Sequence, residues 1–263
     1  MKFTLIGSGF IMPRHAESIN FVGGEIVDII NTAHGDNAWK EAVKNPEVDC
    51  VVILTPNDLH FPIALEALQN NKIVLCEKPL VLNSQEATVL DQYKNIFTTL
   101  QLRHHPLVKQ LKEEISSAKK YEIEMDISVY RDEKYYQSWK GQKERSGGVL
   151  FNLGIHYFDL LVYLFGQPRK IQTDFLDDQT GTGVIEGDNF ICHWKVSTGE
   201  RRDNQKRVFK INGVDYNFSS QDNLSYENLH RNVYQELLKN IGITPEEASV
   251  SIKLVEDLYS SYK

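Results

Sequence analysis

The sequence predicts an α/β protein in which a doubly wound parallel sheet comes first and an α+β domain with a mixed or antiparallel sheet follows. Over the first hundred residues, short apolar runs alternate with helical stretches, which is typical of parallel strands joined by helices. In segment 121–130, apolar and polar side chains alternate instead, as in a sheet with one buried face. Finally, Asn212-Gly213 is a strong hairpin signal between two further strand candidates.

The apolar runs and turn residues place the elements in order. Strands of the first domain are expected at 3–6, 25–30, 50–54, 73–76 and 96–102. Its helices are expected at 13–20, 60–70 and 87–93, the last with Ser84 as N-cap. Strands of the second domain are expected at 121–130, 185–196, 207–211 and 215–218, and helices at 154–165, 228–240 and 245–262. A junction near 103–106 divides the chain into domains 1–103 and 104–263.

The composition excludes several classes of protein. The 263 residues are 41% hydrophobic and 25% charged, which is ordinary for a soluble globular protein. No apolar run approaches the ~20 residues that cross a bilayer, and the first residues are too short a run for a signal peptide. We therefore expect a cytoplasmic protein with no membrane partner. The net charge of −7 argues against nucleic acid. Three widely spaced cysteines in apolar surroundings indicate buried thiols, with no disulfide and no metal site.

A glycine turn follows the first strand. Glycines at this point allow a tight turn and let the backbone approach a pyrophosphate at the N-terminus of the next helix. The third glycine of the usual G-x-G-x-x-G pattern is missing, since Met12 stands there, so an ordinary strand-to-helix turn is the alternative. The residues expected to bind the pyrophosphate are Gly7, Ser8, Gly9, Phe10 and Ile11.

Asn31 closes the second strand, where an acid usually binds the adenosine ribose. An amide can still hydrogen-bond a ribose hydroxyl. No Lys or Arg lies beside it to pair a 2′-phosphate, so the sequence favours NAD over NADP as cofactor.

Polar segments follow the third and fourth strands, at the strand ends that line the ligand crevice of an open α/β sheet. The first contains Thr55, Pro56 and Asn57, with His60 nearby, and the second contains Glu77 and Lys78 before a proline. A helix-capping or surface role is the alternative for the lysine.

In the second domain, Asn152, His156 and Asp159 have spacings of four and three, so they share one face if the segment is helical throughout. A buried core histidine is the alternative for His156.

These motifs, in this order and spacing, resemble the glucose–fructose oxidoreductase, inositol dehydrogenase and rhizopine-catabolism (Gfo/Idh/MocA) family. The chain is most similar to its UDP-N-acetylglucosamine 3-dehydrogenases of the WlbA/WbpB type. The narrower likeness lies in segments 13–15, 76–83, 100–106, 138–141, 152–159, 229–230 and 233–236. Departures are Met12, Asn31, a short connection over 32–49 and an abbreviated region before Leu229.

The resemblance implies NAD-dependent oxidation of the C3 hydroxyl of a UDP-N-acetylglucosamine-type sugar, or its glucuronic acid form, in the biosynthesis of bacterial O-antigen and lipopolysaccharide sugars. It implies that Lys78 and His156 face the nicotinamide and the reacting hydroxyl. We favour His156 as the proton acceptor and Lys78 as its electrostatic partner, with Asp159 orienting one of them; the reverse assignment stays open. Gln101 joins the predicted cofactor residues. Predicted substrate residues are Arg14, His15, Arg103, Trp139, Lys140, Asn152 and His156.

Two other functions stay open. One is a dehydrogenase of a free sugar or inositol in the same family, against which the match through 101–106 speaks. The other is a catalytically inert dinucleotide-binding sensor, against which the intact Lys78 and His156 speak. The resemblance also implies a homodimer or homotetramer formed through the sheet of the second domain.

Overall fold

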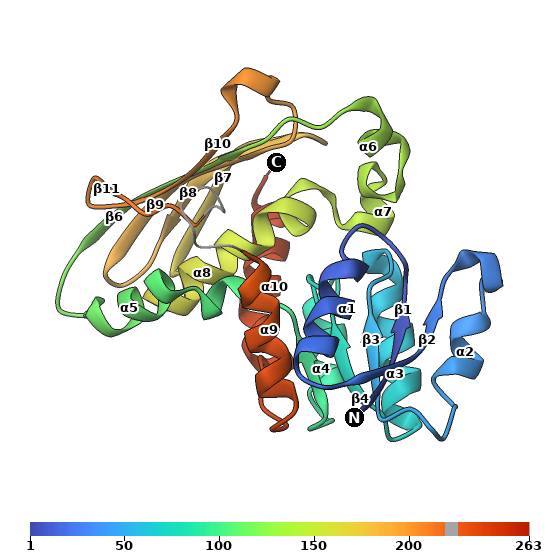
Figure 1. Ribbon diagram of the computed structural model, residues 1–263. Coiled ribbons are helices and arrows are strands. Elements are labelled where there is room, and N and C mark those ends of the chain that lie inside the picture. The colour runs from blue at the N-terminus through green and yellow to red at the C-terminus, as the bar shows by residue number, and fades with distance from the viewer. Residues whose placement is uncertain (219–225, 263) are drawn as a thin grey trace. The chain divides into compact units, whose positions relative to one another are not determined.

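The computed structural model describes residues 1–218 and 226–262 and divides into two compact units (Figure 1). Unit 1 comprises Met1–Gln101 and Tyr226–Ser249, and unit 2 comprises Leu102–Ser225 and Val250–Lys263. The first boundary lies within two residues of the expected one. The expectation of two continuous domains is wrong, however, because a late segment of the chain returns to unit 1.

Unit 1 contains a five-stranded parallel sheet in the order β2-β1-β3-β4-β5. The strands are β1 (Lys2–Ile6), β2 (Glu25–Ile30), β3 (Cys50–Ile53), β4 (Ile73–Cys76) and β5 (Ile96–Thr98), and the connecting helices are α1 (Met12–Phe21), α2 (Ala38–Ala42), α3 (His60–Gln69) and α4 (Ser84–Leu90). This is the predicted Rossmann-like parallel architecture. The strand order reverses between β1 and β3, and such switch points are where open α/β sheets bind ligands.

Two boundaries of unit 1 differ from the sequence prediction. Strand β5 ends at Thr98 because a 3₁₀ turn, Gln101–His104, interrupts the apolar run. Helix α4 is capped by Asn83 and not by Ser84, since the Asn83 side chain accepts a hydrogen bond of 2.9 Å from the Glu86 N–H. An asparagine in an extended conformation is as good an N-cap as serine.

Helix α9 (Tyr226–Leu237) belongs to unit 1 because its apolar side completes the core of that unit. Val233, Tyr234 and Leu237 are buried in one cluster with Phe3 and Leu5 of β1. The first hundred residues therefore do not close their own core, and the late helix supplies one wall of it.

Unit 2 is built on a six-stranded sheet in the order β11-β10-β6-β9-β8-β7 (Figure 1). The mixed sheet confirms the predicted fold class, although only four strands were expected. Only β6 and β9 pair in parallel; the other neighbours are antiparallel. The strands are β6 (Tyr121–Ser128), β7 (Lys170–Leu176), β8 (Thr180–Glu186), β9 (Phe190–Ser197), β10 (Lys206–Ile211) and β11 (Val214–Asp215). The helices are α5 (Pro106–Glu114), α6 (Glu133–Gln137), α7 (Lys143–Ser146), α8 (Ile155–Phe165) and α10 (Pro245–Ser261), whose first residues fall in unit 1.

The strand expected at 185–196 is in fact two strands. Strands β8 and β9 form a hairpin closed by the Gly187 N–H, which donates to the Phe190 carbonyl at 2.9 Å. The prediction overlooked the turn residues Gly187, Asp188 and Asn189, and β7 was not predicted. The Asn212-Gly213 hairpin is confirmed: both residues have positive φ, 49° and 80°, as a type I′ turn requires.

One stretch, Lys143–Phe165, is long and apolar enough to cross a membrane by length and composition, contrary to the sequence expectation. Of its most apolar window, 72% is buried inside the protein. A lipid-facing helix would expose that surface, so the stretch has the character of a core helix, and it contains α8, most of whose residues are buried.

Candidate functional site

The turn after β1 has the geometry of a phosphate-binding loop. Gly7 has a φ of 111°, and a Cβ there would lie 2.5 Å from the Leu54 carbonyl oxygen, so only glycine fits. A Cβ on Gly9, by contrast, would meet nothing within 4 Å. Helix α1 begins just beyond, with no side-chain cap at Ile11 and no acidic residue in its first turn. Open space over backbone N–H groups at a helix N-terminus fits an anionic pyrophosphate.

Asn31 follows β2, as the sequence predicts for a ribose contact, but its side chain also has a local partner. Its Oδ1 accepts a hydrogen bond of 2.9 Å from the Ala33 N–H, and its own N–H donates to His34 Nδ1 at 3.2 Å. This capping box fixes the orientation of Asn31 at the strand end.

His60 joins the segments after β3 and β4. Its ring is completely buried, with Nδ1 2.7 Å from the Pro79 carbonyl oxygen and Nε2 3.1 Å from the Thr55 carbonyl oxygen. Burial lowers the pKa of His60 below its usual 6.5. In this structure the side chain ties together two backbone segments of the predicted cofactor site, and its direct contact with NAD stays a prediction. Asn57, in the segment after β3, is also buried.

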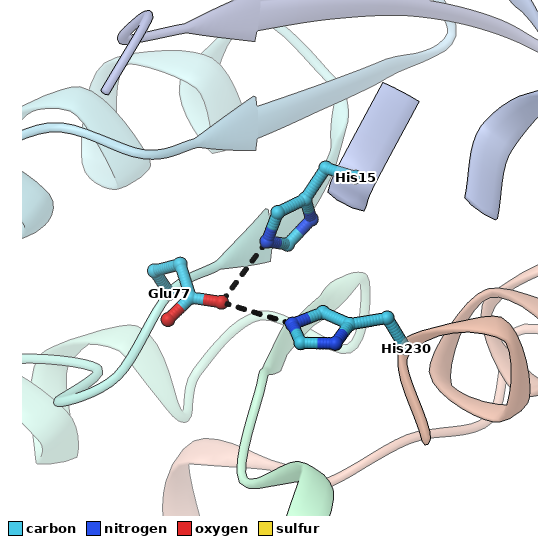
Figure 2. Close-up of side chains that lie close together, drawn as sticks. All are labelled: His15, Glu77 and His230. Carbon is cyan, nitrogen blue, oxygen red and sulfur yellow. Dashed lines mark hydrogen bonds and ion pairs between the residues drawn. The ribbon is translucent and has the colours of Figure 1, made fainter. Parts of the chain in front are cut away.

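Glu77 and Lys78 follow β4. Lys78 is half-buried, and its backbone N–H donates to Glu77 Oε2 at 3.2 Å. The Glu77 side chain turns inward to two histidines, His15 of α1 and His230 of α9 (Figure 2). His15 is fully buried, so in this structure it supports Glu77 and offers no surface to a substrate, contrary to its predicted role.

In unit 2, Asp159 of α8 and Arg103 form a buried bidentate ion pair. The Arg103 Nε donates to Asp159 Oδ2 at 2.8 Å and a terminal nitrogen donates to Oδ1 at 2.7 Å. Both side chains are at least nine-tenths buried, and the guanidinium also lies 4.7 Å from the centre of the Tyr163 ring. Arg103 is therefore a structural partner of Asp159 in this structure, whereas the sequence suggested that it contacts the substrate.

The segment that carries Asn152 and His156 is not one regular α-helix. Leu150–Gly154 form a π-helical turn, and α8 begins at Ile155, so the assumption of one helical face is wrong. Single π-turns are frequent at functional sites. Asn152 donates its amide to the Tyr135 hydroxyl at 2.7 Å, while His156 is half-buried in the first turn of α8.

A cavity of about 250 Å³ lies in unit 2 beside α6, the helix that contains Tyr135. Its walls combine tyrosine rings and two lysines with two aspartates of the β7–β8 turn. The Lys140 ammonium, a predicted substrate contact, lies 5.9 Å from the centres of both the Tyr135 and the Trp139 rings. The lining includes Tyr135, Tyr136, Lys140, Lys143, Asp177, Asp178, Tyr259 and Tyr262.

Three side chains of these sites were not predicted as site residues: His230, Tyr234 and Tyr135. The two residues of α9 belong to a segment noted only for its family likeness. A late helix that returns to unit 1 leaves no local pattern, so only the fold brings it to the strand ends.

Two family models match this chain. One, described as oxidoreductase family, NAD-binding Rossmann fold, matches residues 31–95, and the other, described as oxidoreductase family, C-terminal alpha/beta domain, matches residues 109–192. Both belong to the Gfo/Idh/MocA group, and together they match more than half of the chain.

Among solved structures, the WlbA (WbpB) dehydrogenase from Thermus thermophilus in complex with NAD and α-ketoglutarate has a TM-score of 0.87. It is 28% identical, and the match covers 98% of this chain and 94% of that one. The same dehydrogenase in complex with NAD and UDP-GlcNAcA matches with a TM-score of 0.84.

The curated relatives match shorter parts of this chain. An uncharacterized oxidoreductase of Streptococcus pneumoniae is 31% identical over 57% of this chain and 42% of its own length. The scyllo-inositol 2-dehydrogenase (NADP(+)) IolU of Bacillus subtilis is 24% identical over 75% of this chain and 71% of its own length. This chain thus spans less than half of the length of the pneumococcal relative.

Proposed function

Because this chain belongs to the Gfo/Idh/MocA oxidoreductase family, we propose that it oxidises the C3 hydroxyl of a UDP-N-acetylglucosamine-type sugar, or its glucuronic acid form, with NAD. The observation that carries this proposal is the likeness along 98% of the chain to the Thermus dehydrogenase, described with NAD and with UDP-GlcNAcA. The open space at Gly9, above the uncapped start of α1, supports a dinucleotide in unit 1.

Unit 1 supplies the cofactor residues of the proposal. The loop Gly7 to Ile11 holds the pyrophosphate, Asn31 the adenosine ribose, and the segments at Thr55 and Glu77, with Gln101, the nicotinamide half. NAD, when bound, accepts the hydride. We expect NAD to bind more tightly than NADP because Asn31 offers no cation to a 2′-phosphate; the inositol dehydrogenase relative that uses NADP makes this worth testing.

The proton is managed by Lys78 and His156 in this proposal. His156 takes the hydroxyl proton, since imidazole has a pKa suited to a base near neutral pH. Lys78 carries a positive charge that stabilises the developing alkoxide. Asp159, held by Arg103, fixes the second turn of α8 and with it the direction of His156.

The UDP group is assigned to the side of unit 2 that holds Lys140. A tyrosine-rich cavity with lysines suits a flat base and a diphosphate, because rings stack on bases and ammonium groups pair with phosphate. Trp139 precedes Lys140 in the chain, and Asn152 donates a hydrogen bond to Tyr135, which lines the cavity. Arg14 of α1 is half-buried and remains a predicted diphosphate contact of unit 1.

A second candidate is oxidation of an unactivated polyol, which the likeness to scyllo-inositol dehydrogenase favours. The role in O-antigen sugar synthesis, the cytoplasmic location and the homo-oligomeric state stay predictions.

A ligand screen followed by turnover tests the proposal. A ligand that binds only the native state raises the melting temperature, so NAD, UDP-N-acetylglucosamine, its uronic acid and scyllo-inositol are compared separately and in pairs. We expect stabilisation by NAD, a further rise with a UDP-sugar, and NADH formation from that sugar only. NADH formation from inositol, with no shift by UDP-sugars, would select the second candidate. Binding of NAD without turnover of any sugar, even with a 2-keto acid to reoxidise NADH, would indicate the sensor.

A further inference from the structure

Three side chains of unit 1 meet beneath the segment that carries Lys78, and the proposed chemistry leaves two of them without a role. His15 Nε2 lies 3.0 Å from Glu77 Oε1, and His230 Nε2 lies 3.8 Å from the same oxygen. Figure 2 shows both imidazole rings pointing at this carboxylate from two different helices. The cluster links the first helix of the chain, the end of β4 and the late helix α9.

Burial makes this cluster costly unless its charges are balanced. The exposed fractions of His15, His230 and Glu77 are 0%, 2% and 9%. A carboxylate taken out of water stays ionised only when hydrogen bonds and positive charge compensate it. Burial alone would raise the pKa of Glu77, but its two histidine neighbours hold that pKa well below the ordinary value. The carboxylate is therefore charged, and the histidines are what keep it so.

The two oxygens of Glu77 face different parts of the molecule. Oε1 faces the histidines, and Oε2 accepts the backbone N–H of Lys78 at 3.2 Å. His15 is itself fixed from behind, because its Nδ1 lies 2.8 Å from the hydroxyl of Tyr234, another buried residue of α9. Burial raises the pKa of Tyr234 well above its usual value, so this partner is a neutral phenol.

We propose that His15 and His230 are positioning residues, which hold the Glu77 carboxylate so that its far oxygen fixes the backbone of Lys78. Helix α9 thereby sets the place of the lysine in the reaction. The part of this inference that concerns the role of Lys78 in the reaction rests on the proposed function. The contacts that hold Glu77 and the Lys78 backbone do not depend on it.

The same three side chains are also a candidate metal site, because each offers one ligand atom and these atoms lie within 4.8 Å of one another. The separations from Glu77 Oε1 to the two histidines, 3.0 and 3.8 Å, bracket the ~3.4 Å between ligands of a tetrahedral zinc, so the hydrogen bonds have to decide. Both ring nitrogens of His15 already have hydrogen-bond partners. Among the described residues neither ring nitrogen of His230 has one, which leaves its Nε2 directed at Glu77 as its polar contact. A stoichiometric metal is thus an outcome that the experiment must be able to detect.

Acid should act on this cluster through Glu77, whose protonation would remove the charge that the histidines face. The titratable or charged groups around the carboxylate come from every neighbouring element: His15, His230 and Tyr234, together with Cys76, His60 and Lys78. Removing one histidine should let the pKa of Glu77 rise toward its ordinary value. The further loss of activity that follows protonation of Glu77, at a pH below the limb set by His156, should then begin at a higher pH.

The test compares His230→Leu, which removes the polar ring, with His230→Gln, whose amide can still reach Glu77. We expect kcat to fall roughly 10- to 100-fold in the leucine variant, as a displaced catalytic group does, and the affinity for NAD to change much less. The glutamine variant should recover part of the loss in kcat. The part of the kcat profile that follows protonation of Glu77, below the limb set by His156, should move to higher pH in the leucine variant. Glu17→Gln is the matched control, because it breaks an exposed pair of α1 with Arg231 of α9 and leaves the cluster intact.

A second readout needs no substrate. Lysines are dimethylated with ¹³C, and the Lys78 signal is assigned by its absence in Lys78→Arg. We expect this signal to move in His230→Leu and in Glu77→Gln but to stay in place in Glu17→Gln. If the wild type oxidises no sugar, the proposed function fails while this signal still decides the positioning role. Should His230→Leu not fold, Glu77→Gln carries the same comparison.

Two results would overturn the inference. One is a folded His230→Leu variant with normal kcat, an unmoved kcat profile below the limb set by His156 and an unmoved Lys78 signal. The other is one equivalent of zinc in the purified wild type, measured by mass spectrometry, that is lost in His230→Leu. Absence of zinc together with a moved Lys78 signal would support it.

Discussion

Units 1 and 2 hold their functional side chains by different means. In unit 1 the candidate residues follow the carboxyl ends of parallel strands, so Gly7, Thr55 and Glu77 come together because β1, β3 and β4 are neighbours. In unit 2 the candidate residues are fixed by pairs between distant segments, Arg103 with Asp159 and Tyr135 with Asn152. Topology places the first set, whereas individual polar contacts place the second. We therefore expect unit 1 to tolerate the loss of single contacts better than unit 2.

The largest effect is expected at the reacting groups, one from each unit. Lys78→Met removes a charge and His156→Asn removes the base, while each keeps much of the side-chain volume. We expect kcat to fall roughly 10²- to 10³-fold in either variant, because these interactions strengthen toward the transition state. Binding of NAD, followed by calorimetry, should survive.

Steady-state NADH formation and single-turnover runs measure the fall in kcat of the two variants. Lys94→Met, at an exposed position, is the control. The His156 variant should also lose the acid limb of the pH profile if His156 is the base. Near-normal rates in both variants would show that neither Lys78 nor His156 takes part in the reaction.

The next effect concerns stability and the pair that fixes α8. Asp159→Asn keeps the shape of the side chain but leaves the buried guanidinium of Arg103 without its counter-charge. Breaking a buried pair in this way typically costs 3–5 kcal/mol, so we expect a loss of about 3 kcal/mol in urea unfolding. Lys170→Gln, which breaks the exposed pair with Glu186, should cost less than about 1 kcal/mol.

Equal losses in the free energy of unfolding for Asp159→Asn and Lys170→Gln would contradict the view that buried pairs hold unit 2 together. The double variant Arg103→Leu with Asp159→Leu sharpens the point. Replacing a buried pair by apolar groups is often neutral, so the double variant should be more stable than Asp159→Asn. Its kcat should nevertheless stay low if the pair directs His156.

A smaller effect is expected at the cavity of unit 2. Lys140→Met removes an ammonium beside the Tyr135 and Trp139 rings. If this lysine pairs with the diphosphate, KM for the UDP-sugar should rise roughly tenfold, about 1.4 kcal/mol, with little change in kcat. Lys119→Met, at an exposed position, is the control. An unchanged KM would place the diphosphate elsewhere.

The contrast between the units also explains how far the sequence could be interpreted. Four strands of unit 1 were predicted to within one residue at each end, whereas β5 was predicted four residues too long. The apolar runs of β3 and β4 are buried on both faces, which gives them clear ends. The candidate loops followed from the rule that ligands bind at strand ends. What failed in unit 1 depends on a distant helix: the roles of His15 and His230 appear only once α9 packs against β1.

In unit 2 the prediction was weaker, for a related reason. The prediction ran one strand across 185–196 and overlooked the turn residues Gly187, Asp188 and Asn189, which are typical of a connection between β8 and β9. Arg103 was assigned to the substrate because no sequence pattern identifies the counter-charge of a cation 56 residues away. Spacings of four and three suggested one helix face, but a π-turn at Leu150–Gly154 changes the register before α8.

The smallest effect is a pH dependence of stability that unit 1 owes to His60. Burial holds the pKa of this ring below 6.5 in the folded state, whereas in the unfolded chain it titrates near 6.5. As pH falls through 6.5, the unfolded state binds the proton first, so stability is lost from there down to the folded pKa. The slope is at most about 1.4 kcal/mol per pH unit for one histidine. His15, whose pKa burial also lowers, adds in the same direction.

Urea unfolding between pH 7.5 and 5 measures this slope. His60→Gln cannot titrate, but its amide can still donate to one of the carbonyl oxygens of Pro79 and Thr55. We expect it to flatten the slope below pH 6.5 with little loss of stability at pH 7.5, because the neutral imidazole also has only one N–H to donate. His193→Gln, at an exposed position on β9, should leave the slope as it is in the wild type. A His60→Gln variant with an unchanged slope would mean that the groups responsible for the pH dependence lie outside the segments after β3 and β4. Burial of His60 at the strand ends would then not explain the pH dependence of stability.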